Sequence, residues 1–319
     1  MRTISRLSAC LAMSLLAIID ASPQTISTVK IVVPVPPGGA NDFVARVLAE
    51  QIGRAQGLAF TIENRTGAGG IIAAEAVSRS ATDGSTLLID SNSLLIDALV
   101  QKTNYDPLTS FEPICNLVDV PSVITVNAAT PYRKLADLID AARAKPREIT
   151  LATLGPGGPF RIGYERLRRA ANVDITFVPY PGIAPAVNAL LGGHVGSVFS
   201  SYSTVSEQVN GGRLRALATG SPTRIGPLPA VPTVAESGYP DYEVDVWMGL
   251  WAPAKTPKEA VSQLAGWFTA ALQTLEVKQK LVAQGLFPVG VCATGFSSYL
   301  RRKYAEYGRA IREANIKAE

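Results

Sequence analysis

The sequence predicts an α/β fold made of two lobes, each with a mostly parallel β-sheet flanked by helices. The chain has 319 residues, which is long for one average domain and fits two. Its hydrophobic content of 47% suffices for buried cores, and a charged content of 18% is too low for a disordered chain. Short β-branched runs alternate with helical patterns, which is typical of parallel sheets with right-handed crossovers.

The first 22 residues are typical of a cleavable signal peptide. The positive segment MRTISR precedes a short apolar run, LSACLAMSLLAII, and then the small or polar residues DASPQT. Because this run is too short to span a membrane, we expect cleavage near Ala21 or Ser22 and a soluble protein outside the cytoplasm. The net charge of +4 is spread without basic runs, which argues against nucleic acid as a partner.

Strands and helices are expected to alternate along the rest of the chain. The predicted strands are 31–35, 60–63, 86–90, 122–126, 148–152, 175–178, 195–200, 214–218 and 244–251. The predicted helices are 42–54, 71–80, 135–145, 160–171, 184–191 and 205–210, followed by a helix-rich tail from residue 257. In the first helix, for example, Phe43, Val47 and Leu48 recur at helical period.

The chain is expected to cross between the lobes twice, within 123–128 (VITVNA) and within 248–254 (MGLWAPA). A new helix pattern follows each crossing. Lobe 1 would then comprise 28–125 and 253–319, and lobe 2 would comprise 126–252. Two crossings make a hinge, and such folds bind ligands in the cleft at the carboxyl ends of the strands.

Rare residues restrict the possible chemistry. His194 is the only histidine and lies in the predicted turn LLGGHVGS, so we interpret it as a turn or surface residue. Beyond the signal segment only Cys115 and Cys292 remain; two unpaired buried thiols are the expectation, although an oxidising compartment would allow them to pair. These counts argue against a catalytic triad or a zinc site. Trp247 and Trp251 are expected to pack in a core.

Three glycine-rich loops share one design. PPGGAND follows the first predicted strand, NRTGAGG the second, and TLGPGGP the first strand of the middle lobe, and each precedes a helix. Glycine lets backbone N–H groups approach a ligand, and a helix start adds donors and a positive dipole end. Turn geometry explains one such loop equally well. Three at matching positions favour a carboxylate site across the cleft.

These loops lack nucleotide-binding signatures. Ile72 stands where a dinucleotide motif needs a small residue, and no P-loop motif occurs. Asp42 has two interpretations: it meets a ligand amine, or it serves the start of a helix, which is the more common use. Arg65 either reaches a carboxylate or lies at the surface.

Several longer segments carry a resemblance to a known family. They are KIVVPVPPGGANDFVARVLAEQI, IENRTGAGGIIAAEAVSRSATDGSTLL, FVPYPGIAPAVNALLGGHV and PLPAVPTVAESGYPDYEVDVWMGLWAPAKTP. In this order they resemble the substrate-binding proteins of tripartite tricarboxylate transporters, the Bug or TctC-like family. The resemblance implies a two-lobed, periplasmic-binding-protein-like fold of type II. It also implies a small carboxylated ligand (a di- or tricarboxylate, an amino acid or an aromatic acid) that is delivered to membrane permease subunits.

The resemblance further implies the residues of the ligand site. In lobe 1 they are Pro37, Gly38, Gly39, Asp42, Thr66, Gly67, Gly70, Ser91, Asn92 and Ser93. In lobe 2 they are Thr153, Gly155, Gly157, Arg161, Tyr180, Gly182, Ser200 and Ser201. The chain departs from the family where Arg161 replaces the usual His, Pro181 a Lys, and Ser200 a common Asp. Arg161 either pairs with a second ligand carboxylate or points to solvent and pairs with Glu165, one turn further on.

The combined pattern favours a binding protein over an enzyme. No G-x-S-x-G or H-E-x-x-H motif occurs, and we expect no cofactor, no metal and a monomer. The predicted function is a periplasmic receptor that captures a carboxylated solute and delivers it unchanged to a tripartite tricarboxylate-type transporter. A ligand-binding input protein for a sensor kinase is the alternative, and a secreted enzyme acting on a small organic acid is a less favoured one.

Overall fold

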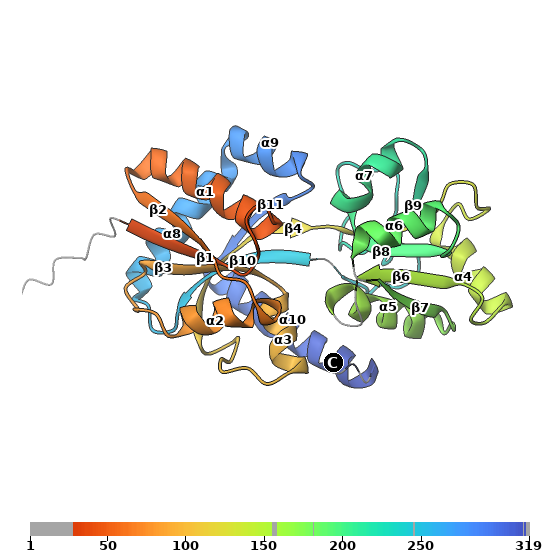
Figure 1. The fold of residues 1–319 in the computed structure, drawn as a ribbon, viewed down its shortest axis with the longest axis horizontal. Helices are drawn as coiled ribbons and strands as arrows, with labels where there is room; N and C mark the ends of the chain where they lie inside the picture. The colour runs from red at the N-terminus through yellow and green to blue at the C-terminus, as the bar shows by residue number, and fades with distance from the viewer. Residues whose placement is uncertain (1–27, 155–157, 181, 245, 315, 317–319) are drawn as a thin grey trace, which may run out of the picture.

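A computed structural model describes residues 28–154, 158–180, 182–244, 246–314 and 316, so the predicted signal peptide lies outside the described residues. Figure 1 shows two lobes side by side. Across the six-stranded sheet of lobe 1 the strands are β11 (Phe287–Cys292), β4 (Phe111–Val120), β10 (Val246–Pro253), β3 (Thr86–Ser91), β1 (Thr28–Val33) and β2 (Ala59–Asn64). Across the five-stranded sheet of lobe 2 they are β7 (Thr176–Tyr180), β6 (Thr150–Leu154), β8 (Ser197–Ser201), β5 (Ser122–Asn127) and β9 (Leu214–Thr219). The predicted two-lobed α/β class is confirmed.

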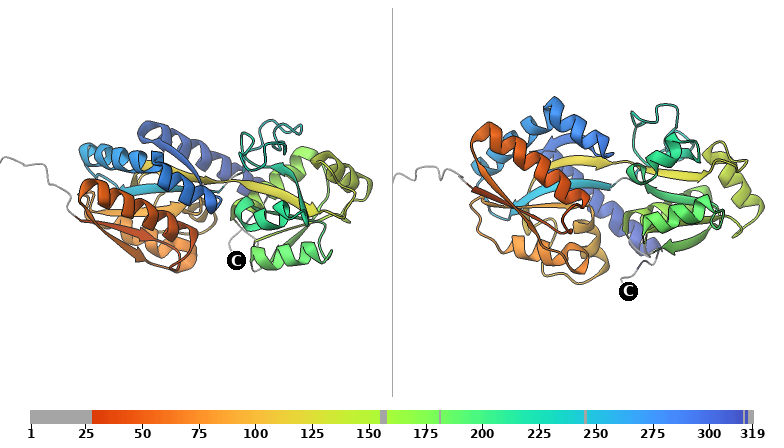
Figure 2. Two further views of the ribbon diagram at one scale, coloured as in Figure 1. Left: turned by 90° about the horizontal axis from the view of Figure 1, so that it is seen from above. Right: turned by 45° about the horizontal axis from the view of Figure 1, so that its top comes forward.

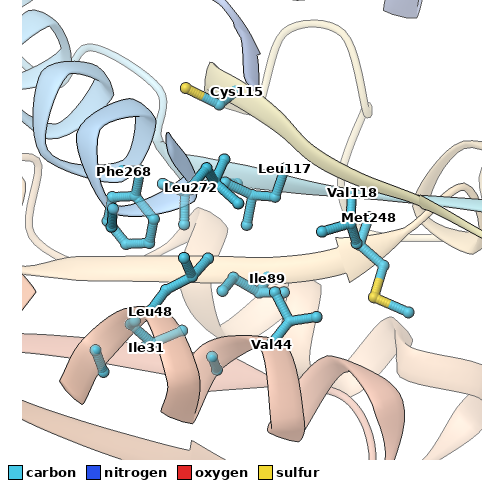
Figure 3. Close-up of a cluster of buried hydrophobic side chains, with 14 of the residues drawn as sticks. Ile31, Val44, Leu48, Ile89, Cys115, Leu117, Val118, Met248, Phe268 and Leu272 are labelled. Carbon is cyan, nitrogen blue, oxygen red and sulfur yellow. The ribbon is translucent and has the colours of Figure 1, made fainter. Parts of the chain in front are cut away.

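Helices cover both faces of each sheet. In lobe 1, α1 (Ala40–Gln56), α8 (Lys258–Gln273) and α9 (Leu275–Ala283) pack on one face. The other face is covered by α2 (Ile71–Ser78), which follows the short 3₁₀ helix η1 (Ala68–Gly70), and by α3 (Ser93–Val100) and α10 (Ala293–Ala314). In lobe 2, α4 (Leu135–Ala144) and α5 (Gly158–Ala171) lie on one face, and α6 (Ile183–Leu191) and α7 (Tyr202–Asn210) on the other. Figure 3 shows the core between α1 and α8, where Val44 and Leu48 approach Leu117 and Phe268.

The parallel strands of both sheets direct their carboxyl ends to the space between the lobes. In lobe 1, β1, β2 and β3 are parallel, and Ser91 at the end of β3 pairs with Met248 near the start of β10, just after the chain returns from lobe 2. In lobe 2, β6, β7 and β8 are parallel, and Ser201 at the end of β8 pairs with Ser122 at the start of β5. The loops that follow these strands therefore face each other across the hinge, where open α/β sheets bind ligands.

The crossings between the lobes differ from the predicted positions. β4 ends at Val120 and β5 begins at Ser122, so the chain leaves lobe 1 at Pro121 instead of within 123–128. All of β10 belongs to the lobe 1 sheet, so the return precedes Val246 and residues 246–252 belong to lobe 1. Both sheets are mixed instead of mostly parallel, because β5 and β10, which begin at the crossings, run antiparallel to their neighbours.

Cys115 and Cys292 form a disulfide, which corrects the expectation of two unpaired thiols. Cys115 on β4 and Cys292 on β11 are direct partners in the antiparallel register, with Cα atoms 4.0 Å apart. The sequence pattern does not indicate this pairing, because the tail from residue 257 is predicted to be helical and β11 interrupts it. The bond fixes the edge strand β11 to the sheet.

Trp247, Trp251 and the histidine lie where they were expected. Trp247 and Trp251 are fully buried, and Trp247 Nε1 donates a hydrogen bond to Tyr307 Oη at 3.2 Å, which confirms core packing. His194 is exposed in the turn after α6, which confirms the interpretation as a turn residue. Among the described residues, no helix is both long and apolar enough to cross a membrane.

The last helix, α10, connects the lobes in addition to the two crossings. Figures 1 and 2 show it running from lobe 1 toward α5 of lobe 2. Ile162 on α5 is buried in the core that α2, α3 and α10 form. Lys303 on α10 pairs with Glu243, in the segment that leads from lobe 2 into β10, at 2.7 Å, and Arg169 on α5 pairs with Glu313 at 3.4 Å. The lobes are thus packed together on the α5 and α10 side.

Candidate ligand site between the lobes

The loop between β1 and α1 is organised by Asp42, in the first turn of α1. Asp42 is 2% exposed, and its carboxylate accepts hydrogen bonds from the Gly38 N–H, Arg46 Nε and Asn64 Nδ2, each at 2.9 Å. Burial raises the pKa of Asp42, but these donors together outweigh burial and hold the pKa below its usual value. Both carboxylate oxygens of Asp42 already accept hydrogen bonds within lobe 1. The geometry therefore favours a structural role, in which Asp42 holds the loop at the start of α1, over contact with a ligand amine.

The glycines of this loop use their own N–H groups inside the loop. The Gly38 N–H donates to Asp42, and the Gly39 N–H donates to the Pro36 carbonyl at 3.1 Å. Gly38 has a φ of +85°, and a Cβ on Gly39 would lie 2.8 Å from Val35 Cγ2. The fold of the loop therefore requires both glycines, whether or not a ligand binds.

The loop between β2 and α2 presents its first residues to solvent and buries its last. Thr66 and Gly67 are exposed, with Gly67 at a φ of +125°. Gly70 is buried, donates its N–H to the Gly67 carbonyl at 3.0 Å, and has no room for a Cβ, which would lie 3.1 Å from Pro34 Cβ. Thr66 and Gly67 are therefore open to solvent, whereas Gly70 packs the loop against lobe 1.

The polar residues after β3 face two directions. The hydroxyls of Ser91 and Ser93 hydrogen-bond each other at 2.8 Å, and Ser93 Oγ donates to Asp90 Oδ1 at 3.1 Å. Asn92 is 1% exposed and donates from Nδ2 to Tyr307 Oη inside lobe 1, so its side chain serves the core. Burial raises the pKa of Asp90 to about 7, although bonds from Ser91 and Ser93 oppose this shift.

In lobe 2, the predicted residues lie at the ends of three parallel strands. Thr153 lies near the carboxyl end of β6 and is fully buried. Its hydroxyl has no hydrogen-bond partner among the described residues. Tyr180 ends β7 and Gly182 is the N-cap residue before α6, both half-buried. Ser200 is fully buried and Ser201 half-buried at the end of β8. All five therefore lie at the side of the sheet where the parallel strands β6, β7 and β8 reach their carboxyl ends.

Arg161 pairs with Glu165, its neighbour one turn along α5. The distance between Arg161 Nη2 and Glu165 Oε1 is 2.7 Å, and the guanidinium carbon lies 4.0 Å from the ring centroid of Phe177. The side chain is only 19% exposed. The sequence-based alternative in which Arg161 pairs with Glu165 and points to solvent is therefore right about the pair and wrong about the exposure. A contact between Arg161 and a ligand carboxylate stays a prediction. Gly155 and Gly157 fall outside the described residues.

A cavity of about 690 Å³ lies between the lobes, on the side of the crossing strands that faces α1 and α7. Lobe 1 lines it with the β1–α1 loop, β4, β10 and the turn between α9 and β11, and lobe 2 lines it mainly with α7. The volume suits a small organic ligand. Of the predicted site residues, Gly38 and Ser201 line this cavity, and the other described ones do not.

Helix starts from both lobes meet this cavity. Ala40 opens α1 and lines it, and the N–H groups of Ala40, Asn41 and Asp42 donate to no acceptor among the described residues. In α7, Ser203 and Thr204 also line it, and their N–H groups are likewise unpaired within the described part of the chain. Two first turns therefore offer free donors and positive dipole ends. None of the described lining residues carries a charge at neutral pH.

Several lining residues were missed by sequence reasoning. Ser203 and Thr204 continue the hydroxyl-rich run SSYST, which offered a signal. Phe43 and Met248 gave none, because each resembles an ordinary core residue of a helix or strand. Gly285 has a φ of +68°, and a Cβ there would lie 2.7 Å from Ser203 Cβ, so the α9–β11 turn of lobe 1 touches α7 of lobe 2.

Curated relatives are similar over almost the whole chain. Protein BugT of Bordetella pertussis is 32% identical over 302 residues, which cover 94% of this chain and 93% of that protein. A Pseudomonas protein encoded between tcbD and tcbE is also 32% identical, over 94% of this chain and 89% of its own length.

Solved structures show the same arrangement. The periplasmic binding protein BugD superposes with a TM-score of 0.73 at 31% identity, over 92% of this chain and 99% of that one. A Rhodopseudomonas palustris protein, Rpa4515 with adipate, superposes with a TM-score of 0.76 at 31% identity, over 91% and 98%. The sequence profile described as "Tripartite tricarboxylate transporter family receptor" matches residues 44–316. Because this match spans most of the chain, the protein belongs to the tripartite tricarboxylate transporter receptor family, the TctC or Bug proteins.

Proposed function

We propose that this receptor captures a small carboxylated solute between its lobes and delivers it, unchanged, to permease subunits of a tripartite tricarboxylate-type transporter. Structural relatives carry such ligands: adipate in Rpa4515, and malate in MatC, another Rhodopseudomonas palustris protein with a TM-score of 0.70 at 27% identity. We place the protein in the periplasm as a monomer, after removal of residues 1–22.

One observation carries the proposal for this chain: the first turns of α1 and α7 meet a common cavity from opposite lobes. Backbone N–H groups and helix dipoles stabilise an anion without a charged side chain. A carboxylate held in this way is neither protonated nor attacked, because the described lining offers no histidine, thiol or ionised base. Binding and release then need only motion of the lobes.

Hinge motion supplies that release. The connections are the single residue between β4 and β5, the segment before β10, and the packing of α10 on α5. A ligand that contacts both lobes binds the closed arrangement better than the open one, and shifts the population by that difference. Closure would also bring Thr66, Gly67, Ser91, Thr153 and Tyr180 closer to the bound solute.

A thermal-shift screen of the mature protein against small organic acids tests the proposal. A ligand at 100 times its dissociation constant stabilises the folded state by about 2.7 kcal/mol. We expect at least one carboxylate to raise the melting temperature of the protein. The NMR signals of that carboxylate should persist unchanged through prolonged incubation with the protein. Stabilisation only by nucleotides or metal ions, or steady turnover of the acid, would overturn the proposal. If deletion of the gene for this protein abolishes cellular uptake of the bound acid, delivery to a transporter is supported. If uptake is intact but the acid no longer induces gene expression, the sensing alternative is supported.

A further inference from the structure

The two walls of the interlobe cavity differ in chemistry. Lobe 1 contributes mostly apolar side chains, including Phe43, Val246, Met248, Val282 and Leu286. Lobe 2 contributes mostly hydroxyls, namely Ser201, Tyr202, Ser203, Thr204 and Ser206. An occupant that fills this space therefore meets hydrocarbon on one side and hydrogen-bonding groups on the other.

The apolar wall grows directly out of the lobe 1 core. Met248 is 4% exposed and lies at one end of the side-chain cluster that Figure 3 shows. Phe43 is half-buried on α1 and packs against the same cluster, and Leu286 is 3% exposed. The part of this wall open to water is Val282, which is 43% exposed, together with half-buried Phe43 and Val246, and an apolar ligand group that covers it gains about 25 cal/mol for each Å² buried.

The hydroxyl wall is arranged around the start of α7. The Tyr202 N–H donates to the Pro121 carbonyl, which ties the helix start to the hinge at 2.8 Å. The next two N–H groups, of Ser203 and Thr204, have no acceptor in the described part of the chain, and Thr204 Oγ1 donates to the Ser201 carbonyl at 2.6 Å. The exposed donors of this first turn suit a carboxylate.

We propose that this cavity selects amphipathic acids, which place a carboxylate at the first turn of α7 and an apolar body against Phe43 and Met248. This inference rests on the proposed function and names its substrate class. Hydroxylated acids fit poorly, because hydroxyls along the body would lose water against Phe43 and Met248, and a second carboxylate fits only where it reaches the N–H groups of the first turn of α1. Amino acids fit poorly as well, because the described lining has no carboxylate for an ammonium group.

Calorimetry with straight-chain monocarboxylates from acetate to octanoate tests the apolar wall. Each buried methylene contributes about 0.8 kcal/mol, so affinity should rise about fourfold per added carbon until the wall is covered. Malate, citrate and glutamate are titrated in parallel. If any of these binds more tightly than every alkanoate, or if affinity does not rise with chain length, the inference is overturned while the proposed function stands. If no carboxylate binds at all, both fail.

Two matched pairs of variants locate the ends of the ligand. Phe43→Gln should flatten the chain-length dependence, whereas Phe60→Gln should not, because Phe60 is half-buried against the same core but does not line the cavity. Thr204→Asp should weaken octanoate binding at least tenfold while stabilising the helix start, and Thr204→Asn should weaken it less than threefold. Equal chain-length slopes for the two Phe variants, or equal affinities for the two Thr204 variants, would contradict the assigned orientation.

Discussion

Removing the Cys115–Cys292 disulfide should cost this protein a large part of its stability. The bond joins residues 177 apart in sequence. In the chain-entropy treatment, a cross-link over a loop of that length restricts the unfolded ensemble by about 5 kcal/mol. That figure is comparable to the entire free energy of unfolding of many domains, about 5–15 kcal/mol. The replacement Cys115→Ala with Cys292→Ala leaves little strain, because alanine fits wherever cysteine does.

Urea unfolding of the mature protein, followed by tryptophan fluorescence, measures this cost. Trp247 and Trp251 are fully buried in lobe 1 and Trp267 packs against its core, so tryptophan emission reports the unfolding of the lobe that carries the disulfide. The double alanine variant should unfold at a lower urea concentration and with a steeper slope, since its unfolded state is less compact. Wild-type protein treated with a reductant serves as the control and should match the variant.

A second consequence is local. Among the described strands β11 lies at the edge of its sheet and pairs only with β4, so without the bond its amide protons should exchange with solvent faster than those of β1 or β3. If the double variant unfolds within about 1 kcal/mol of wild type with an unchanged slope, the entropic argument is wrong. If untreated protein reacts with a thiol reagent at two sites when denatured, the bond does not form at all.

Three further perturbations test features of the structure. Burial raises the pKa of Asp90 to about 7, so the protonated carboxyl favours the folded state and stability falls as pH rises from about 4 to 7. Asp90→Asn should therefore raise the melting temperature at pH 8 and change it little at pH 4. An equal difference in melting temperature between variant and wild type at both pH values would refute this. Asp42→Ala removes the buried carboxylate that accepts hydrogen bonds from the exposed Gly38 N–H and Arg46 and from Asn64, and should destabilise by about 2 kcal/mol in urea. Lys303→Met and Glu243→Gln, combined in a double-mutant cycle, should show a coupling energy of about 1–3 kcal/mol; additive effects would mean that α10 is not held by this pair.

Much of the fold follows from periodicity, and the exceptions have physical causes. Nine strands are indicated by β-branched runs, but β4 and β11 are not, because Pro113 and Asn116 interrupt β4 and because Pro288 and Gly290 are turn signals within β11. Long-range pairing with β10 and with the disulfide partner overrides those local signals. The crossings shift for a similar reason: the run through Pro121 is apolar on both sides, so only pairing decides which half joins which sheet.

The candidate site could be predicted at the level of loops but not of atoms. Strand order alone brings the carboxyl ends of the parallel strands together, so the motifs that follow those strands lie at the facing ends of the two lobes. The choice of donors depends on local bonds that motifs do not reveal. Asn92 turns into the core to meet Tyr307, and Arg161 lies along α5 with Glu165, although both stand at positions typical of ligand contacts.

The β1–α1 loop shows most clearly why a glycine motif is weaker evidence than it looks. Its two glycines are needed for a positive φ and for a close approach to Val35, and their N–H groups are already taken by Asp42 and Pro36. The two glycines are thus required by the conformation of the loop itself, and the unpaired N–H donors begin at Ala40, the first residue of α1. A carboxylate site of this kind is therefore specified by where two helices begin and how the hinge aligns them, which depends on pairing across both sheets and not on the motif alone.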